Sequence, residues 1–335
     1  MQEGSLLEIE NLTVEFRMFE GIVKAVDNLS LKIKKNSVMG IIGESGSGKS
    51  VTAQSILRIV PSPPGRTANG KILFRSESNR DKIIDILSLN PQGNEIRKIR
   101  GKEISMIFQE PMTSFGPLDT IGRQIIEVIN THEPEVEKEE GRERIIRLLS
   151  DVGIPRAEKV IDDYPHQLSG GMRQRAMIAM ALICKPRLLL ADEPTTALDV
   201  TVQAQILSLL KDLQNSYRMS MMYITHNLSV ICEIADDITV MYLGNVCETC
   251  DINTIKTNPL HPYTQALWKS IPNMTGEIAK LEPISGSVPS LAEIPRGCVF
   301  STRCTRVIKG VCDGEVRPKL TEIEPGHFVS CFLYK

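Results

Sequence analysis

The sequence lacks any apolar run long enough to cross a lipid bilayer, and its first residues, MQEGSLLEIE, lack the basic and apolar regions of a signal peptide. It also lacks an excess of either charge: 39 Lys and Arg stand against 41 Asp and Glu, for a net charge of -2. That balance gives no electrostatic reason to expect nucleic acid as a partner. We therefore expect a cytoplasmic protein that binds no nucleic acid and reaches a membrane only through a partner protein.

Three apolar segments, SVMGIIG, RLLLADEP and MSMMYITH, predict buried strands. Predicted helices separate them, which indicates an α/β fold with a mostly parallel sheet covered on both faces. LLEIENLTVEF and AVDNLSLKI alternate apolar with polar residues and predict half-buried strands, and DDITVMYLGNVCE predicts a closing hairpin.

The domain organisation follows from two changes along the chain. The mostly helical stretch after Thr120 is too long for a single crossover, which indicates an inserted α-helical subdomain at about residues 110–182. After about Asp251 prolines become frequent and the chain ends in a group of cysteines. We therefore expect a domain over residues 1–255 and a C-terminal extension over residues 256–335.

GESGSGKS, Gly43–Ser50, matches G-x-x-x-x-G-K-[ST] between a predicted buried strand and a predicted helix. Glycines let backbone N–H groups curl around phosphate oxygens, and the helix N-terminus adds partial positive charge. Lys49 would reach the β- and γ-phosphates and Ser50 would bind Mg²⁺. A plain glycine-rich turn is the weaker alternative, because the lysine, strand and helix are all present. The predicted nucleotide-binding residues are Gly43, Glu44, Ser45, Gly46, Ser47, Gly48, Lys49, Ser50 and Thr52.

RLLLADEP places two carboxylates at the end of a predicted core strand, where ligands bind in open α/β sheets. Asp192 would hold Mg²⁺, directly or through water. Glu193 is placed to orient and deprotonate an attacking water. Alone, Asp-Glu-Pro could simply end a strand, but the upstream phosphate-binding motif favours the role in Mg²⁺ binding and catalysis.

GESGSGKS, IFQEP, LSGGMRQR, RLLLADEP, TALDV and ITHN occur in this order, and together they resemble the ATP-binding-cassette (ABC) ATPases of membrane transporters, over about Leu6 to Cys250. The resemblance implies a P-loop NTPase core with an antiparallel β subdomain. It also implies that two ATPase subunits close head to tail, each capping the other's ATP.

Roles for single residues come from this resemblance. Gln109 looks like the Q-loop glutamine that senses Mg²⁺ and water, Glu193 matches the catalytic glutamate, and His226 matches the switch histidine at the γ-phosphate. Asp199 matches the D-loop aspartate, although it could also cap the following helix. Phe16 or Phe19 would stack on adenine, and either could be core instead. The residues predicted to contact the partner's ATP are Gln167, Ser169, Gly170 and Gly171, and those predicted to hold Mg²⁺ are Ser50, Gln109 and Asp192.

Three further segments, QEPMTSFGPLDTIGRQI, NPLHPYTQALWKSIP and GCVFSTRC with two later cysteines, resemble the dipeptide/oligopeptide importer ATPases. One departure is Phe115-Gly116, where that branch usually has Leu-Asn. The resemblance implies a paralogous second ATPase subunit, two permease subunits and an extracytoplasmic peptide-binding protein, with this subunit peripheral on the cytoplasmic face of the membrane. Nickel and oligosaccharide importers of the same branch remain alternatives.

The extension carries Cys298, Cys304, Cys312 and Cys331, and a reducing cytoplasm argues against structural disulfides. Four thiolates suit structural Zn²⁺ or an iron–sulfur cluster. Zinc sites usually have close C-x₂-C pairs, and the wider spacing here favours [4Fe–4S], as does the resemblance to importer ATPases. Unliganded thiols are the alternative. Cys247 and Cys250 form a C-x₂-C pair without a second pair nearby, which we interpret as structural.

Two other classes of protein are compatible with single motifs. A soluble ABC ATPase acting on DNA or ribosomes usually has two cassettes or a long coiled coil, and neither is present. A non-catalytic scaffold cassette needs degenerate motifs, whereas Lys49, Asp192, Glu193 and His226 are all in place.

Overall fold

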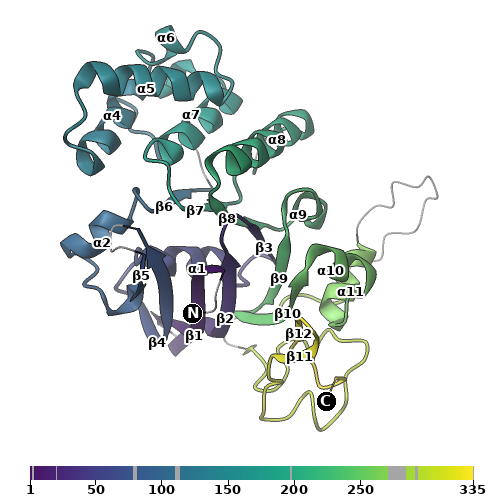
Figure 1. Ribbon diagram of the computed structural model, residues 1–335. Coiled ribbons are helices and arrows are strands. Elements are labelled where there is room, and N and C mark those ends of the chain that lie inside the picture. The colour runs from purple at the N-terminus through teal and green to yellow at the C-terminus, as the bar shows by residue number, and fades with distance from the viewer. Residues whose placement is uncertain are drawn as a thin grey trace. The chain divides into compact units, whose positions relative to one another are not determined.

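The computed structural model describes Met1 and residues 4–19, 21–77, 81–109, 114–196, 198–270, 284–290 and 293–334. Parts of three predicted motifs lie outside the described residues: 110–113 of the Q-loop run, Ala197, and 271–272. The chain forms two compact units, whose elements are labelled in Figure 1. Unit 1 comprises Met1–Phe74, Ile84–Ser88 and Tyr223–Lys335, and unit 2 comprises Arg75–Ile83 and Leu89–Met222.

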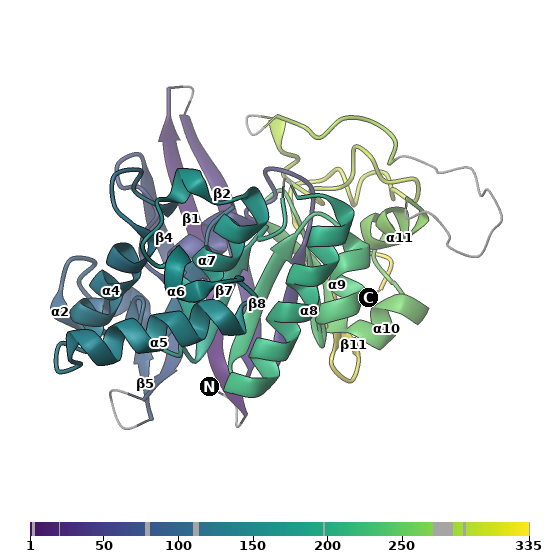
Figure 2. The same ribbon diagram turned by 90° about the horizontal axis from the view of Figure 1, so that it is seen from above.

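Unit 1 begins with an antiparallel β layer. β1 (Ser5–Met18) pairs with β2 (Gly21–Lys34) on one side and with β4 (Gly65–Ser76) on the other, both antiparallel. Figure 2 shows β1 and β2 as a long hairpin. The two strands predicted from alternating residues are therefore confirmed.

The central strands of unit 1 are β3 (Val38–Ile42) and β9 (Asp237–Tyr242), which pair in parallel and are buried along their whole length. Burial on both faces explains the continuous apolar run of β3. β9 continues into β10 (Asn245–Asp251) as an antiparallel hairpin, which confirms the predicted one. Leu243 and Gly244 at its turn both have positive φ, as a two-residue type I′ turn requires.

The C-terminal extension adds two strands beside β10. β12 (His327–Val329) pairs with β10, and β11 (Thr321–Glu324) pairs with β12, both antiparallel. The sequence did not predict these strands, because β11 is exposed throughout and has no apolar pattern. They cover the edge of β10, which would otherwise present unpaired backbone groups.

A buried carboxylate fixes the extension to β10. Glu248 is fully buried and accepts hydrogen bonds from Leu260 N (2.7 Å), His261 N (2.8 Å) and His327 Nε2 (2.7 Å). A buried carboxylate is tolerated when several donors satisfy it. All three of its partners belong to residues 256–335.

Unit 2 combines two parallel strands with a group of helices. β6 (Ile104–Ile107) pairs in parallel with β7 (Leu188–Asp192), and both are buried. In Figures 1 and 2 the helices α4 (Ile121–His132), α5 (Lys138–Asp151) and α7 (Gly170–Leu182) gather together. They lie in the stretch that was predicted to be mostly helical.

The remaining elements are short or connect these layers. The predicted helix after the phosphate-binding motif is α1 (Lys49–Ile56). The others are β5 (Lys82–Asp85), η1 (Ile86–Ser88), α2 (Asn94–Ile99), α6 (Ala157–Val160), η2 (Pro165–Gln167), α8 (Val200–Tyr217), β8 (Ser220–Thr225), α9 (Leu228–Ile234), α10 (Ile252–Thr257) and α11 (Pro262–Lys269).

His261 should make the protein acid-sensitive. It is 1% exposed, and its Nδ1 accepts from Tyr263 N (3.0 Å) at the start of α11. Burial lowers the pKa of His261 to about 3. Below pH 6.5, therefore, this histidine is protonated in the unfolded chain but stays neutral in the folded chain. The free energy of unfolding should therefore fall by about 1.4 kcal/mol per pH unit as pH drops below 6.5.

Urea unfolding between pH 7 and pH 4 measures this slope. His261→Asn, which can still cap the helix, should flatten it, whereas His166→Asn at an exposed histidine should not. An unchanged slope in His261→Asn would contradict the assignment.

Candidate functional site

The predicted phosphate loop, residues 43–50, connects β3 to α1 as the sequence predicted. Lys49 is buried, and its Nζ donates to Gly43 O (2.7 Å), Glu44 O (3.0 Å) and Ser47 Oγ (3.3 Å). The lysine thus folds back across the loop, with its ammonium held by two backbone carbonyls and one hydroxyl. A cation in this position can bind an anion that enters the loop.

Two glycines of the loop are required by close contacts. A Cβ on Gly43 would overlap the carbonyl oxygen of Met241 at the end of β9. Gly48 has φ +93, and a Cβ there would overlap Ala25 O. The loop is also tied to the β9–β10 turn, because Gly244 N donates to Ser47 O (3.0 Å).

In unit 2, the structure brings two predicted catalytic residues together. Gln109 Nε2 donates to Glu193 Oε2 (3.1 Å), and Thr196 Oγ1 donates to the same oxygen (3.0 Å). Glu193 has φ +46, a strained conformation for a residue with a side chain, and such strain concentrates at functional sites. Asp192 precedes it as the buried last residue of β7. Thr196 was not predicted; only its place three residues after Glu193 could have suggested it.

The predicted signature and D-loop residues begin helices of unit 2. Ser169 caps α7 by accepting from Met172 N (3.3 Å), and Ser169 and Gly170 are exposed. Asp199 caps α8 by accepting from Val202 N (2.9 Å), the local role that the sequence allowed. Gln167 is exposed, but its side-chain oxygen accepts from Tyr164 N (2.7 Å). Each helix therefore has a polar cap at its start.

Other predicted residues have mixed surroundings. His226 is exposed and directly follows the buried strand β8. Thr52 is fully buried, and its hydroxyl donates to Gly48 O (2.9 Å) within α1. Phe19 is fully exposed beside the β1–β2 turn, whereas Phe16 is half-buried next to Gly65. That Phe16 or Phe19 stacks on adenine stays a prediction.

The four cysteines of the extension, which we call the thiol cluster, lie close enough to influence one another. Burial raises the pKa of Cys298 to about 11, and repulsion from the thiolates of the other three adds to the rise. Burial likewise raises the pKa of Cys304 and of Cys331, and the remaining pairs of the cluster repel in the same way. The cluster thus comprises Cys298, Cys304, Cys312 and Cys331.

Every sulfur of the thiol cluster accepts a backbone N–H. Arg306 N donates to Cys304 Sγ (3.4 Å) and Ile308 N donates to Cys312 Sγ (3.3 Å). Backbone hydrogen bonds from Phe300 and Leu333 lower the pKa of Cys298 and Cys331 against the effect of burial. Such donors favour thiolates and tune bound metal centres.

The cluster does not have the arrangement of a single-ion site. Within the described residues, no three or more His, Cys, Asp or Glu side chains are positioned to hold one metal ion. Cys247, which we interpreted as structural, is fully buried in β10, and after burial the thiol of Cys298 contributes most to raising its pKa. A fifth thiol therefore borders the cluster, which spacing alone could not show.

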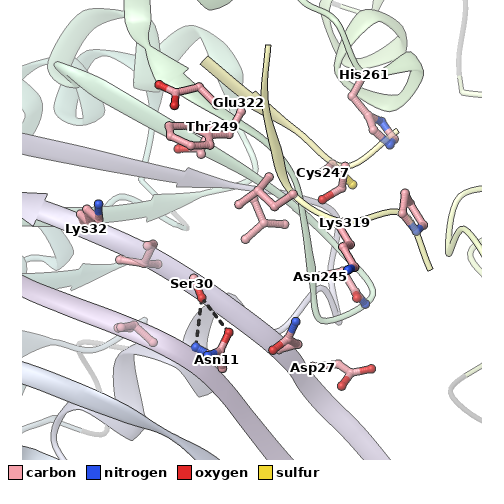
Figure 3. Close-up of a pocket in the computed structure, with 18 of the residues that line it drawn as sticks. Asn11, Asp27, Ser30, Lys32, Asn245, Cys247, Thr249, His261, Lys319 and Glu322 are labelled. Atoms are coloured by element: carbon pink, nitrogen blue, oxygen red, sulfur yellow. Dashed lines mark hydrogen bonds between the residues drawn. The ribbon is translucent and has the colours of Figure 1, made fainter. Parts of the chain in front are cut away.

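A cavity of about 940 Å³ lies between the β1–β2 hairpin, β10 and the extension. Figure 3 shows Asn11 and Ser30 on the two hairpin strands, with Cys247 and His261 across the cavity from them. None of residues 43–50 lines it. The cavity is therefore separate from the phosphate loop.

Sequence reasoning missed Arg303, which pairs with Glu44 of the phosphate loop. Arg303 Nη1 and Nη2 donate to the two carboxylate oxygens of Glu44 (2.6 and 3.2 Å). Burial works against the charge of Arg303, but hydrogen bonds with Glu44 and Tyr242 outweigh it and raise the pKa of Arg303. Arg303 lies within the segment GCVFSTRC, but the sequence analysis singled out only the cysteines of that segment.

None of the helices described here is both long enough and apolar enough to span a bilayer.

Comparisons with known proteins give two family matches. A family model described as ABC transporter matches residues 26–196, and one described as oligopeptide/dipeptide transporter, C-terminal region matches residues 247–312. The second match contains the thiol-cluster residues Cys298, Cys304 and Cys312, and also His261 and Tyr263.

Similar proteins of Bacillus subtilis (strain 168) match over nearly the whole chain. The oligopeptide transport ATP-binding protein AppD is 46% identical, with 99% of this chain and 98% of AppD covered. The dipeptide transport ATP-binding protein DppD is 44% identical, with 98% of this chain and 94% of DppD covered. Among solved structures, dimeric MJ0796, a bacterial ABC transporter cassette, is 28% identical with a TM-score of 0.63, covering 73% of this chain and 98% of that chain.

Gly43→Ala should weaken ATP binding by about tenfold or more, because relieving the overlap with Met241 O must displace the loop. Equilibrium binding of MgATP to the purified protein measures this. Gly4→Ala is the control, since an added Cβ at Gly4 has nothing within 4 Å and Gly4 lies outside the loop. Equal affinities of Gly43→Ala and Gly4→Ala would contradict the tight-loop argument.

Proposed function

Because the chain belongs to the ATP-binding proteins of ABC transporters, in their oligopeptide and dipeptide branch, we propose that it hydrolyses ATP to power import of oligopeptides or dipeptides. The observation that carries the proposal is the phosphate loop at the end of β3, with Lys49 folded across it. The similar B. subtilis proteins are named for oligopeptides or dipeptides, which favours peptides over nickel or oligosaccharides.

Within this function, the loop residues would bind the phosphates of ATP, with Lys49 at the β- and γ-phosphates. Ser50, Gln109 and Asp192 would hold Mg²⁺, which neutralises charge on the phosphate oxygens. Glu193 would accept a proton from the attacking water, and its contacts with Gln109 and Thr196 support a fixed orientation for its carboxylate. His226 would contact the γ-phosphate.

The signature residues Gln167, Ser169, Gly170 and Gly171 would bind ATP held by a second ATPase subunit, which we take to be a paralogue. The exposure of Ser169 and Gly170 supports this role. ATP would then favour the closed dimer because it makes more contacts in the closed state than in the open one. Two permease subunits would take up the movement at the cytoplasmic face of the membrane, and a peptide-binding protein would deliver substrate to them.

Glu193→Gln should lower ATP hydrolysis by about 100-fold or more while ATP still binds, because the amide cannot accept the proton. Phosphate release by the purified protein and uptake of a labelled peptide by cells with the complete transporter measure the two consequences. Glu322→Gln, at an exposed position in β11, is the control and should change neither. Hydrolysis equal to wild type would refute the role of Glu193, and unchanged peptide uptake would refute the transport function.

We further propose that the thiol cluster holds a [4Fe–4S] cluster. Mutual proximity of the four thiols and a backbone N–H at each sulfur support it. Zinc needs its ligands around a single ion, and the described side chains offer no such arrangement. Four irons, each bound by one thiolate, fit more widely separated sulfurs.

Protein purified without oxygen should show a visible absorption band and contain about four iron atoms per chain. Cys304→Ser should lose most of the iron, whereas Cys184→Ser, a buried cysteine of unit 2, should retain it. A colourless protein, with zinc or with four free thiols, would refute the iron–sulfur proposal.

A further inference from the structure

Glu44 of the phosphate loop contacts both the loop itself and the C-terminal extension. Its carbonyl accepts from Lys49 Nζ (3.0 Å) and from Ser47 N (3.2 Å). Its N–H donates to Tyr263 Oη (3.1 Å), in the C-terminal extension. The main chain of Glu44 is therefore held from inside the loop and from the extension together.

The carboxylate of Glu44 meets a guanidinium that is already fixed in place. Beyond its two bonds to Glu44, Arg303 donates to Tyr242 Oη (3.2 Å), Ser285 O (3.1 Å) and Ile284 O (3.4 Å). It also lies over the Tyr242 ring, 5.7 Å from the centroid. Its side chain is 4% exposed, against 27% for that of Glu44. A bidentate pair this well shielded from solvent is strong and geometrically specific.

The turn that carries Arg303 is itself docked on the same strands. Arg303 N donates to Phe300 O (3.0 Å), and Ser301 N donates to Cys298 O (3.0 Å). The Phe300 ring packs against Tyr242 and Tyr263 with centroids 5.3 and 5.2 Å apart. Arg303 therefore reaches the phosphate loop from a rigid turn rather than from a mobile tail.

The charge of Glu44 matters because the loop is expected to receive a polyanion. An uncompensated carboxylate in a phosphate loop repels a triphosphate, and the repulsion grows as the site is shielded from water. Arg303 cancels this charge and fixes the side chain of Glu44, while Tyr263 holds its backbone. Unit 1 thus supplies a cation to its nucleotide site from outside the nucleotide motifs.

We propose that Arg303 is a positioning residue for ATP, which neutralises and orients Glu44 so that the C-terminal extension becomes part of the nucleotide site. This inference rests on the proposed function, since it takes residues 43–50 as the ATP-binding loop. Its consequence is that ATP affinity depends on Arg303 only while residue 44 carries a negative charge.

The test is equilibrium binding of a non-hydrolysable MgATP analogue to the purified full chain. Arg303→Ala should raise Kd by about tenfold or more, because it leaves a partly buried carboxylate unpaired. Adding Glu44→Gln to Arg303→Ala should restore Kd to within about threefold of wild type, since the repulsion is gone. A purely structural role of Arg303 would not be rescued by a change in the loop.

Arg296→Ala is the matched control. Arg296 also lies in the extension and pairs with Glu315, but both side chains are mostly exposed, so its Kd should equal that of wild type. If Arg303→Ala does not fold, judged by circular dichroism, Arg303→Gln with and without Glu44→Gln replaces it. An unchanged Kd in the single variant, or a loss that Glu44→Gln does not rescue, would overturn the inference.

Lys49→Ala separates this inference from the function on which it rests. If Lys49→Ala binds the analogue as tightly as wild type, the loop is not the ATP site and the proposed function fails. If Lys49→Ala loses binding while Arg303→Ala does not, the function stands and only the role of Arg303 fails.

Discussion

The pairing of β9 with a strand on each side is the constraint on which unit 1 depends. Its parallel partner β3 leads into the phosphate loop, and its antiparallel partner β10 receives the extension. All six residues of β9 are buried, so neither pairing can shift without exposing apolar side chains. The carbonyl of Met241 in this strand also decides that residue 43 must be glycine. β9 thereby sets the position of the phosphate loop and of the C-terminal extension that contacts this loop.

Much of the fold could be predicted because its signals are local. β3, β7 and β8 are continuous buried runs, and β1 and β2 were found from the alternation of apolar and polar residues. β12 could not be predicted because it forms by pairing with β10, about 80 residues earlier, and β11 because it forms by pairing with β12; neither has an apolar pattern of its own. Tertiary context, rather than propensity, makes them strands.

In the candidate site, too, some residues could be predicted from local motifs and others could not. The contact between Gln109 and Glu193 joins two residues that motifs had already marked, although they lie 84 positions apart. Arg303 lies within GCVFSTRC, a segment noted for its cysteines and not for the arginine, and its contact with Glu44 spans 259 positions. Tyr263 belonged to a segment noted only for its resemblance to peptide importers, and its hydroxyl turned out to accept from the loop. Sequence motifs identify groups that act directly on a ligand. Groups that act through a second residue can be identified only from the contacts in the folded structure.

The polar contacts of the extension also bear on how the protein can be divided experimentally. A fragment that stops after β10 would retain each nucleotide motif, because the last of them is His226. It would nevertheless leave the carboxylate of Glu248, the hydroxyl of Tyr242 and the amide of Glu44 without the partners they have here. Buried polar groups stripped of their partners are costly, so such a fragment would be a poor substitute for the full chain in biochemical work. The useful boundary of the nucleotide-binding part is therefore set by hydrogen bonding and not by the position of its last motif.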